Sequence, residues 1–165
     1  MDKREYRELC RLAANGGTKE FARLYECVYR EMYYTAYYSL ADDTDAIDVV
    51  TGAVKDGFAA VGRLHSEAAF RTFMMRSLCA RIKQRHKEYA AQGTPVQFEP
   101  NLLRPNADGV DIKQEFNRLP DTERMIAAMY VAGRFLTEEI ASYIGISVGA
   151  VKKKLRRSLE QLELD

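Results

Sequence analysis

The chain has 165 residues, a formal net charge of +1 and 47% hydrophobic residues, which fits one domain or two small ones in a soluble globular protein. Its three cysteines, Cys10, Cys27 and Cys79, are too far apart for a disulfide framework or a paired-cysteine zinc site. The polar start does not resemble a signal peptide, and no apolar stretch is long enough for a membrane span. We therefore expect a cytoplasmic protein with no membrane span, no metal and no cofactor.

Apolar residues at helical spacing predict four helices in the first 91 residues, and no stretch alternates as a strand would. We expect these helices over residues 2–14, 18–40, 45–61 and 67–90. Asp43 or Thr44 is expected to cap the third helix. Gly52 and Gly57 lie inside that helix, where each costs about 1 kcal/mol relative to alanine. Close packing, the approach of a partner and a weak helix all explain them equally well.

The second half of the fourth predicted helix is a run of cations without an acid. The run comprises Arg71, Arg76, Arg81, Lys83, Arg85 and Lys87. Such a segment repels itself, and nucleic-acid phosphates would relieve the repulsion. Two histidines, His65 and His86, lie on polar stretches and are expected at the surface. Tyrosines of the second helix could stack on bases, but packing at the rim of a core explains their positions better.

Residues 92–111 differ in composition from the helical segments on either side. They contain Pro95, Pro100 and Pro105 with several glycines and asparagines, which disfavour regular structure. We interpret this stretch as a linker, with apolar residues that can dock on a neighbour. Pro120 then starts a helix that ends near Gly133. The sequence therefore predicts an all-α protein of two small helical domains, residues 1–91 and 112–165, joined by the proline-rich linker 92–111.

A helix-turn-helix pattern lies between Phe135 and Leu162. Thr137 is expected to cap its first helix, Gly145 to end it, and Ser147 to cap the second. On the second helix Val148, Val151, Leu155, Ser158, Leu159 and Leu162 form one face. Gly149, Ala150, Lys153, Arg156 and Arg157 form the opposite face, with Lys152 and Lys154 on the flanks. Small residues at the start and cations further along suit a major groove and its phosphates. A solvated amphipathic helix is the alternative for the cation run alone, and the preceding helix and turn favour DNA.

With both halves considered, the chain resembles a sigma factor of the sigma-70 family, in its short two-domain extracytoplasmic-function group. Residues 21–25 (FARLY), 40–48 (LADDTDAID) and 70–76 (FRTFMMR) resemble region 2. Residues 119–124 (LPDTER), 136–141 (LTEEIA) and 145–152 (GISVGAVK) resemble region 4. The resemblance covers most of the chain, and the two halves in this order are more specific than either alone.

The resemblance implies transcription initiation with core RNA polymerase and promoter DNA as partners, and an anti-sigma protein as a further one. Region 2 would bind polymerase through Asp45, Asp48 and Thr51. The cations from Arg71 to Lys87 would hold the melted strand of the minus-ten element. Region 4 would read the minus-thirty-five element as a duplex through Ser147, Gly149, Ala150, Lys152, Lys153, Lys154, Arg156 and Arg157.

Region 2 departs from the family pattern at Thr51-Gly52, where Gln-Glu is usual, at Phe73 for tryptophan, and at Ala80 for asparagine. A stand-alone helix-turn-helix regulator, a sigma-like protein without initiation activity and an interaction protein therefore remain alternatives. An enzyme is not expected, because the sequence has no phosphate loop, nucleophile elbow or metal-ligand spacing.

Overall fold

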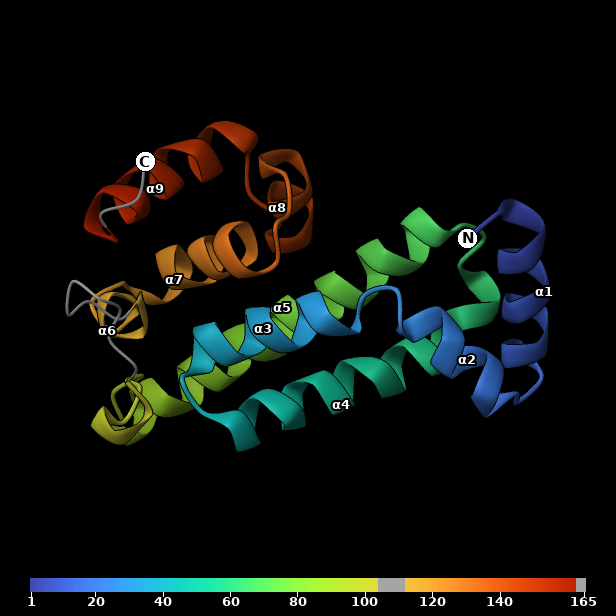
Figure 1. The fold of residues 1–165 in the computed structure, drawn as a ribbon, viewed down its shortest axis with the longest axis horizontal. Coiled ribbons are helices and arrows are strands. Elements are labelled where there is room, and N and C mark those ends of the chain that lie inside the picture. Colours follow the sequence, from blue (N-terminus) through green and yellow to red (C-terminus); the bar gives the residue numbers. More distant parts are fainter. Residues whose placement is uncertain (104–111, 163–165) are drawn as a thin grey trace.

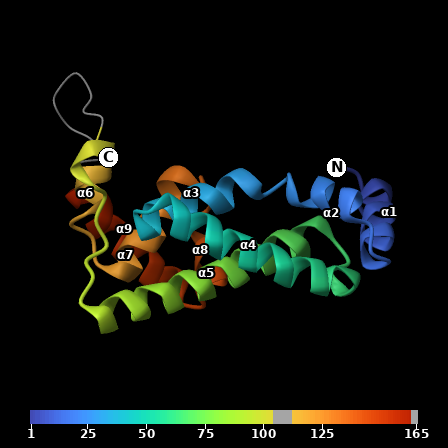
Figure 2. The ribbon, with the colours of Figure 1, turned by 90° about the horizontal axis from the view of Figure 1, so that it is seen from below.

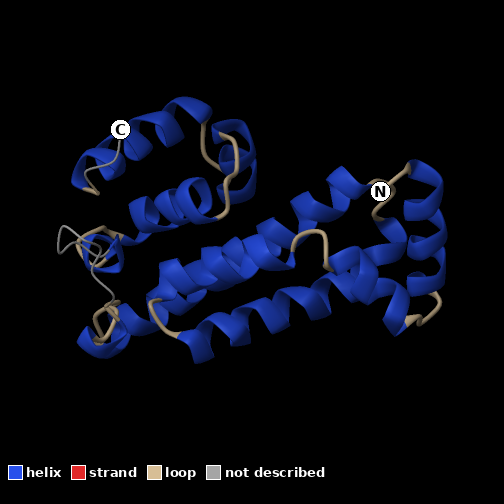
Figure 3. Ribbon diagram, viewed as in Figure 1, coloured by secondary structure: helices blue, strands red, loops and turns tan. Residues whose placement is uncertain are grey.

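The computed structural model describes residues 1–103 and 112–162, and in this part of the chain all regular structure is helical (Figures 1 and 3). The N-terminal half contains α1 (Lys3–Ala14), α2 (Thr18–Tyr25), α3 (Tyr29–Leu40), α4 (Asp43–Ala60) and α5 (Glu67–Gln92). The C-terminal part contains α6 (Ile112–Phe116), α7 (Asp121–Ala127), the π-helix η3 (Ala128–Ala132), α8 (Thr137–Ile144) and α9 (Val148–Gln161). The all-α prediction is confirmed.

Short polar side chains begin the long helices. Asp2, Asp42 and Ser66 are N-caps, and their side chains accept hydrogen bonds from backbone amides three residues later. Each bond satisfies an amide that has no partner within its helix. The cap of α4 is thus Asp42, one residue before the predicted Asp43 or Thr44.

The predicted helix over residues 18–40 is two helices. Its first part, α2, ends at Tyr25, and α3 starts at Tyr29 after a turn. Val28 leaves the helical region with φ −133°, and its side chain is fully buried in the core. The break has no glycine or proline to signal it, because packing of Val28 rather than local preference sets the turn.

The helices α4 and α5 pack closely, and two glycines of α4 permit this. A Cβ atom at Gly57 would lie 2.2 Å from Sδ of the fully buried Met74, and one at Gly52 would lie 2.3 Å from Nη1 of Arg81. Close packing, one of three explanations left open for these glycines, is therefore what the structure shows. Acidic residues of α4 are thereby brought beside the cations of α5.

The C-terminal elements α7, η3 and α8 pack on the side of α3 and α5 that faces away from α4, and α9 packs on α7 and α8 (Figures 1 and 2). One hydrophobic core runs through both halves, from Phe70 and Leu78 of α5 to Met129 of η3 and Ile140 of α8. The start of the expected linker also docks: Phe98 is buried, its ring contacts Tyr37 and Tyr38, and its amide donates to Oδ1 of Asn117. The rest of the linker, residues 104–111, lies outside the described residues. The domain boundaries stay a prediction.

Among the described residues, no helix combines the length and the apolar character needed to cross a membrane.

Candidate nucleic-acid interface

The helix pair α8–α9 begins with a cap that differs from the predicted one. Leu136 is the N-cap of α8, and Thr137 is the first helical residue. The Oε1 atom of Glu139 accepts a hydrogen bond from the Leu136 amide at 2.8 Å. Thr137 as the cap was therefore wrong, because the glutamate three residues into the motif satisfies the exposed amide instead.

The turn between α8 and α9 follows the predicted chemistry. Gly145 has φ +84°, a left-handed conformation that glycine adopts without a Cβ penalty, and its amide donates to the Ala141 carbonyl at 2.8 Å. Ser147 then caps α9, with Oγ accepting from the Ala150 amide at 3.1 Å. Because both ends of the turn are fixed by hydrogen bonds, α9 leaves α8 in a defined direction.

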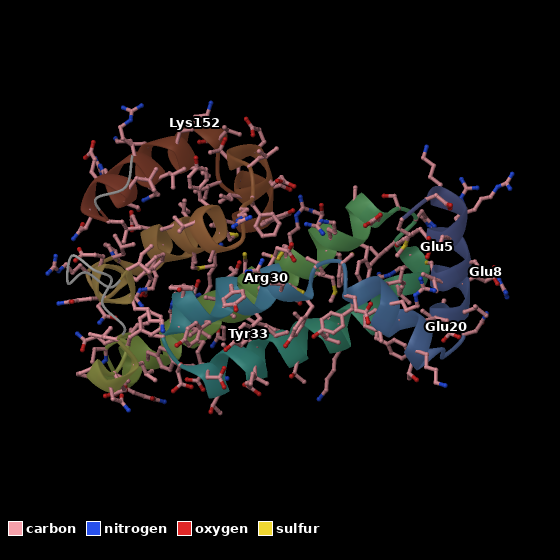
Figure 4. All side chains as sticks on the ribbon, viewed as in Figure 1. Glu5, Glu8, Glu20, Arg30, Tyr33 and Lys152 are labelled. Atoms are coloured by element: carbon pink, nitrogen blue, oxygen red, sulfur yellow. The ribbon has the colours of Figure 1, made fainter. Side chains whose placement is uncertain are left out.

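The two faces of α9 divide as the sequence predicts. Its inner face packs on the core through Val151, Leu155 and Ser158, which are all buried. The outer face exposes the predicted duplex-binding residues Ser147, Gly149, Lys152, Lys153, Arg156 and Arg157, while Ala150 is half-buried. Figure 4 shows Lys152 extending away from the body of the molecule. Gly149 faces open space, with no other atom within 4 Å of a Cβ built there.

Lys154 differs from the other predicted duplex-binding cations. Its Nζ lies 2.9 Å from Oε1 of Glu123 on α7, and both side chains are largely shielded from solvent. Burial alone would raise the pKa of Glu123, but the hydrogen bond from Lys154, a backbone hydrogen bond and the charges of Lys154 and Arg157 together outweigh burial and lower it. The pair ties α9 to α7, and this contact positions the helix.

The α5 cations predicted to bind a single strand mostly donate to protein groups. Arg81 donates to both carboxylate oxygens of Asp56, and Arg85 pairs with Asp48 and Asp45 on the same side. These partners belong to α4. The pKa of Asp56 is held below its usual range by the hydrogen bond from Ser77 and by the Arg81 guanidinium, which together outweigh burial.

The remaining α5 cations point elsewhere. Arg71 donates to the Cys27 carbonyl at 2.5 Å, in the turn between α2 and α3. Arg76 and Lys83 donate to α8 on the opposite side of α5 from α4. Lys87 is exposed and has no hydrogen-bond or ion-pair partner within residues 1–103 and 112–162.

The C-terminal part of the chain is similar to a known protein family. Residues 110–162 match the family model described as sigma-70, region 4. The match covers the C-terminal third of the chain. The helix pair α8–α9, with its exposed basic face, lies within the matched residues. No curated protein matches the sequence.

Two solved structures share the fold over nearly the whole chain. CnrH, solved in complex with the cytosolic domain of CnrY, has a TM-score of 0.67 and 18% identity, covering 96% of this chain and 95% of that one. The sigma factor RpoE, solved with the anti-sigma factor NepR from Bartonella quintana, has a TM-score of 0.64 and 20% identity, covering 88% of this chain and 96% of that one. Their likeness to this chain is one of fold.

The predicted polymerase-binding residues lie on α4. Asp48 and Thr51 are exposed, whereas Asp45 is half-buried and accepts a hydrogen bond from the Tyr89 hydroxyl. The helix α4 lies on the opposite side of α3 and α5 from the C-terminal helices (Figure 1). Asp45 and Asp48 also form ion pairs with Arg85 of α5. These two aspartates therefore link α4 to α5 while remaining partly accessible to solvent.

His86 was expected at the surface and is buried instead. Its Nε2 lies 2.8 Å from the Ser39 carbonyl, between α5 and α3. The surface assignment was wrong because the polar residues that flank His86 point outward while its own position on α5 faces the core. Apolar Leu78, Cys79 and Ile82 continue the same helical stripe and are the signal that could have indicated this.

Proposed function

We propose that this protein is a sigma factor of the two-domain, extracytoplasmic-function group, which directs core RNA polymerase to promoters in the cytoplasm. The observation that carries the proposal is the region 4 helix pair with a small, exposed start and a basic outer face on α9. The fold shared with the sigma factor RpoE over most of both chains supports the assignment. The protein supplies recognition, and the polymerase supplies the chemistry.

Duplex recognition falls to α9. Ser147, Gly149 and Ala150 lie in its first turn, where small side chains let a helix approach base edges in the major groove. Lys152, Lys153, Arg156 and Arg157 follow on the exposed side, where they can reach phosphates. Lys154 holds the helix to Glu123 and acts by positioning it.

Strand capture falls to the cations of α5, and polymerase binding to Asp45, Asp48 and Thr51 on α4. The two sets of residues meet at Arg85, which pairs with Asp45 and Asp48, whereas Arg76 and Lys83 donate to α8 on the other side of α5. The helix α4 itself lies away from the C-terminal helices, so polymerase can engage α4 without displacing them. The departures of region 2 from the family pattern at Thr51-Gly52 lie on this polymerase face.

We further infer a protein partner that regulates the sigma factor. The two solved structures described above are complexes with a second protein, the cytosolic domain of CnrY in one and an anti-sigma factor in the other. An anti-sigma protein for this chain is consistent with those two arrangements.

A binding experiment with core RNA polymerase tests the proposal. We expect the purified protein to co-elute with core polymerase in a one-to-one complex, and to bind promoter duplex far more tightly within that complex than alone. A stand-alone regulator would show the reverse pattern, with tight duplex binding and no polymerase complex. That pattern would contradict the proposal. A complex that forms but initiates nowhere would instead identify a sigma-like protein without initiation activity.

A further inference from the structure

A groove of about 570 Å³ lies between α1 and the connection from α4 to α5, at the end of the molecule opposite α6 (Figure 1). One wall is α1, which contributes Arg7 and Arg11, and the other wall contains Gly62 of the 3-10 helix η1 (Val61–Arg63) and His65. None of the described residues that line this groove is acidic. A groove with three basic side chains and no carboxylate attracts an anion.

A second groove of about 400 Å³ adjoins the first and shares Tyr6, Arg7 and His65 with it. Its lining also includes the carboxylates of Asp2 and Glu67, so its charge is mixed. A carboxylate close to an anion repels it. We therefore expect an anionic ligand in the first groove and not in the second.

Buried hydrogen bonds join the two walls of the first groove. The Tyr6 hydroxyl donates to the Leu64 carbonyl at 2.5 Å, and Sγ of Cys10 donates to the Val61 carbonyl at 3.1 Å. Both donor side chains are buried, and burial raises the pKa of Tyr6, so its hydroxyl keeps the proton that it donates. The groove is therefore formed before a ligand arrives, and binding needs little ordering of the protein.

The basic side chains of the groove are available to a ligand. Arg7 and His65 are exposed, and neither has a hydrogen-bond or ion-pair partner within residues 1–103 and 112–162. Arg11 pairs with Glu8, but both side chains are about three-fifths exposed, and such a surface pair contributes little to stability. Arg7 and Arg11 lie four residues apart on one face of α1, where like charges repel and an anion between them relieves the repulsion.

We propose that this groove is a phosphate-binding site, separate from the DNA-binding and polymerase-binding residues assigned above. Arg7 and Arg11 bind phosphate oxygens through their guanidinium groups, whose planar set of N–H donors matches phosphate geometry. His65 donates an N–H from the opposite wall. The volume of the groove lies in the range of small-ligand pockets, so it holds a phosphate and part of the molecule that carries it.

Two kinds of molecule carry this chemistry, a free nucleotide and a nucleic-acid strand. A free nucleotide would place its phosphates between the two arginines. A strand bound along α5 can continue into the groove, because His65 lies just before the start of α5 at Glu67. The inference goes beyond the proposed function, which assigns no role to α1, and either source of phosphate satisfies it.

Two double variants of equal charge separate the groove from general attraction between a cationic surface and phosphate. Arg7→Gln/Arg11→Gln removes two charges from the groove. Arg4→Gln/Arg63→Gln removes two charges from exposed positions on α1 and η1 outside the groove lining, and is the matched control. Ala14→Leu places a larger apolar side chain at an exposed position of the lining without changing the charge. Circular dichroism confirms that each variant keeps its helix content.

Two titrations of the purified chain, in a phosphate-free buffer of low ionic strength, use one probe each. Isothermal titration calorimetry with ATP in the presence of EDTA measures the binding of a free nucleotide. Fluorescence anisotropy with a labelled mixed-sequence single-stranded oligonucleotide measures the binding of a strand. We expect Arg7→Gln/Arg11→Gln to bind at least one probe roughly tenfold or more weakly than Arg4→Gln/Arg63→Gln, because charge-assisted hydrogen bonds to phosphate are lost. Ala14→Leu should weaken binding of the same probe.

A loss with ATP assigns the groove to a free nucleotide, and a loss with the oligonucleotide alone assigns it to a strand. Equal affinities of the two double variants for both probes would overturn the phosphate site, as would a wild-type protein that binds neither probe. Neither titration uses polymerase. A failure of the proposed sigma activity therefore shows in the polymerase experiment and leaves the result for the groove intact.

Discussion

The basic runs of α5 and α9 are similar in sequence and different in structure. On α9 the exposed cations Lys152, Lys153, Arg156 and Arg157 face solvent, and Lys154 alone among the run forms an ion pair within the described residues. On α5 every predicted strand-binding cation except Lys87 donates to a protein group in residues 1–103 and 112–162. A run of charge therefore predicts a nucleic-acid surface only where no neighbouring element supplies acceptors.

The neighbours explain the difference. The helix α5 lies between α4, which presents Asp45, Asp48 and Asp56, and the carbonyl end of α8. Among residues 1–103 and 112–162, no other helix faces the outer side of α9, and its exposed cations have no acceptor from that part of the chain. The α9 cations are therefore accessible to a ligand in the free protein, whereas most of the α5 cations already have acceptors within the described residues.

Reversing a charge on α9 should have the largest effect. We expect Lys153→Glu to weaken promoter-duplex binding by the holoenzyme on the order of tenfold to a hundredfold, and to lower the salt dependence by about one ion, because it sets a carboxylate against phosphate. Lys19→Glu on α2 makes the same charge change at an exposed site far from α9 and is the control. Binding should be measured by anisotropy over a salt series, and equal losses in both variants would refute the role of α9.

Gly57→Ala tests whether close helix packing keeps the α4 acids beside α5. The new methyl would lie 2.2 Å from Sδ of Met74, which is fully buried, so the methionine side chain would have to shift within the core. We expect a loss of about 1–3 kcal/mol in the free energy of unfolding, as for other overpacked cores. Urea denaturation measures it, and an unchanged midpoint would show that α4 and α5 are less tightly packed than we describe.

Gly52→Ala tests the release of one α5 cation. Its methyl would lie 2.3 Å from Nη1 of Arg81, at the mobile end of a partly exposed side chain, so Arg81 should swing away from Asp56. The higher helix propensity of alanine offsets the loss of the Arg81–Asp56 ion pair. We therefore expect the free energy of unfolding to change by less than about 1 kcal/mol. Because Arg81 is then released from Asp56, the affinity of the protein for a single-stranded oligonucleotide should rise roughly twofold to threefold. A fall in that affinity would contradict the account of Arg81.

The smallest expected effect is the pH dependence of the Arg81–Asp56 pair. The pKa of Asp56 is depressed in the folded protein, so its stabilising contribution is present above the unfolded value of about 3.9 and is lost as pH falls through the lower folded value. Both side chains are about two-fifths exposed, so Asp56→Asn should cost at most about 1 kcal/mol at pH 7. Urea titrations should show this difference vanish near pH 2, and a constant difference would contradict the assignment.

Most of the fold could be predicted from the sequence, because apolar spacing and capping residues are local signals. The α8–α9 pair shows this best: Gly145 and Ser147 set the turn, and Val151 and Leu155 face inward as their spacing predicts. The turn at residues 26–28 could not be predicted, since only the burial of Val28 explains it.

The hydrogen-bond and ion-pair partners of the α5 cations could not be predicted, because these partners are distant in the sequence. Asp56 lies 25 residues from Arg81, and Ser142 lies 66 residues from Arg76. Periodicity identifies which residues share one helix face, and it contains no information about which other helix meets that face. The roles of these residues in strand capture and polymerase binding stay predictions.

Transcription in vitro from a library of genomic fragments tests the central claim most directly. Core RNA polymerase would be supplied with the wild-type protein, with Lys153→Glu, or with no added protein, and the transcript starts would be sequenced. We predict new starts that depend on the wild-type protein, share two upstream boxes and are lost with Lys153→Glu. Starts identical to those of core polymerase alone would contradict the account.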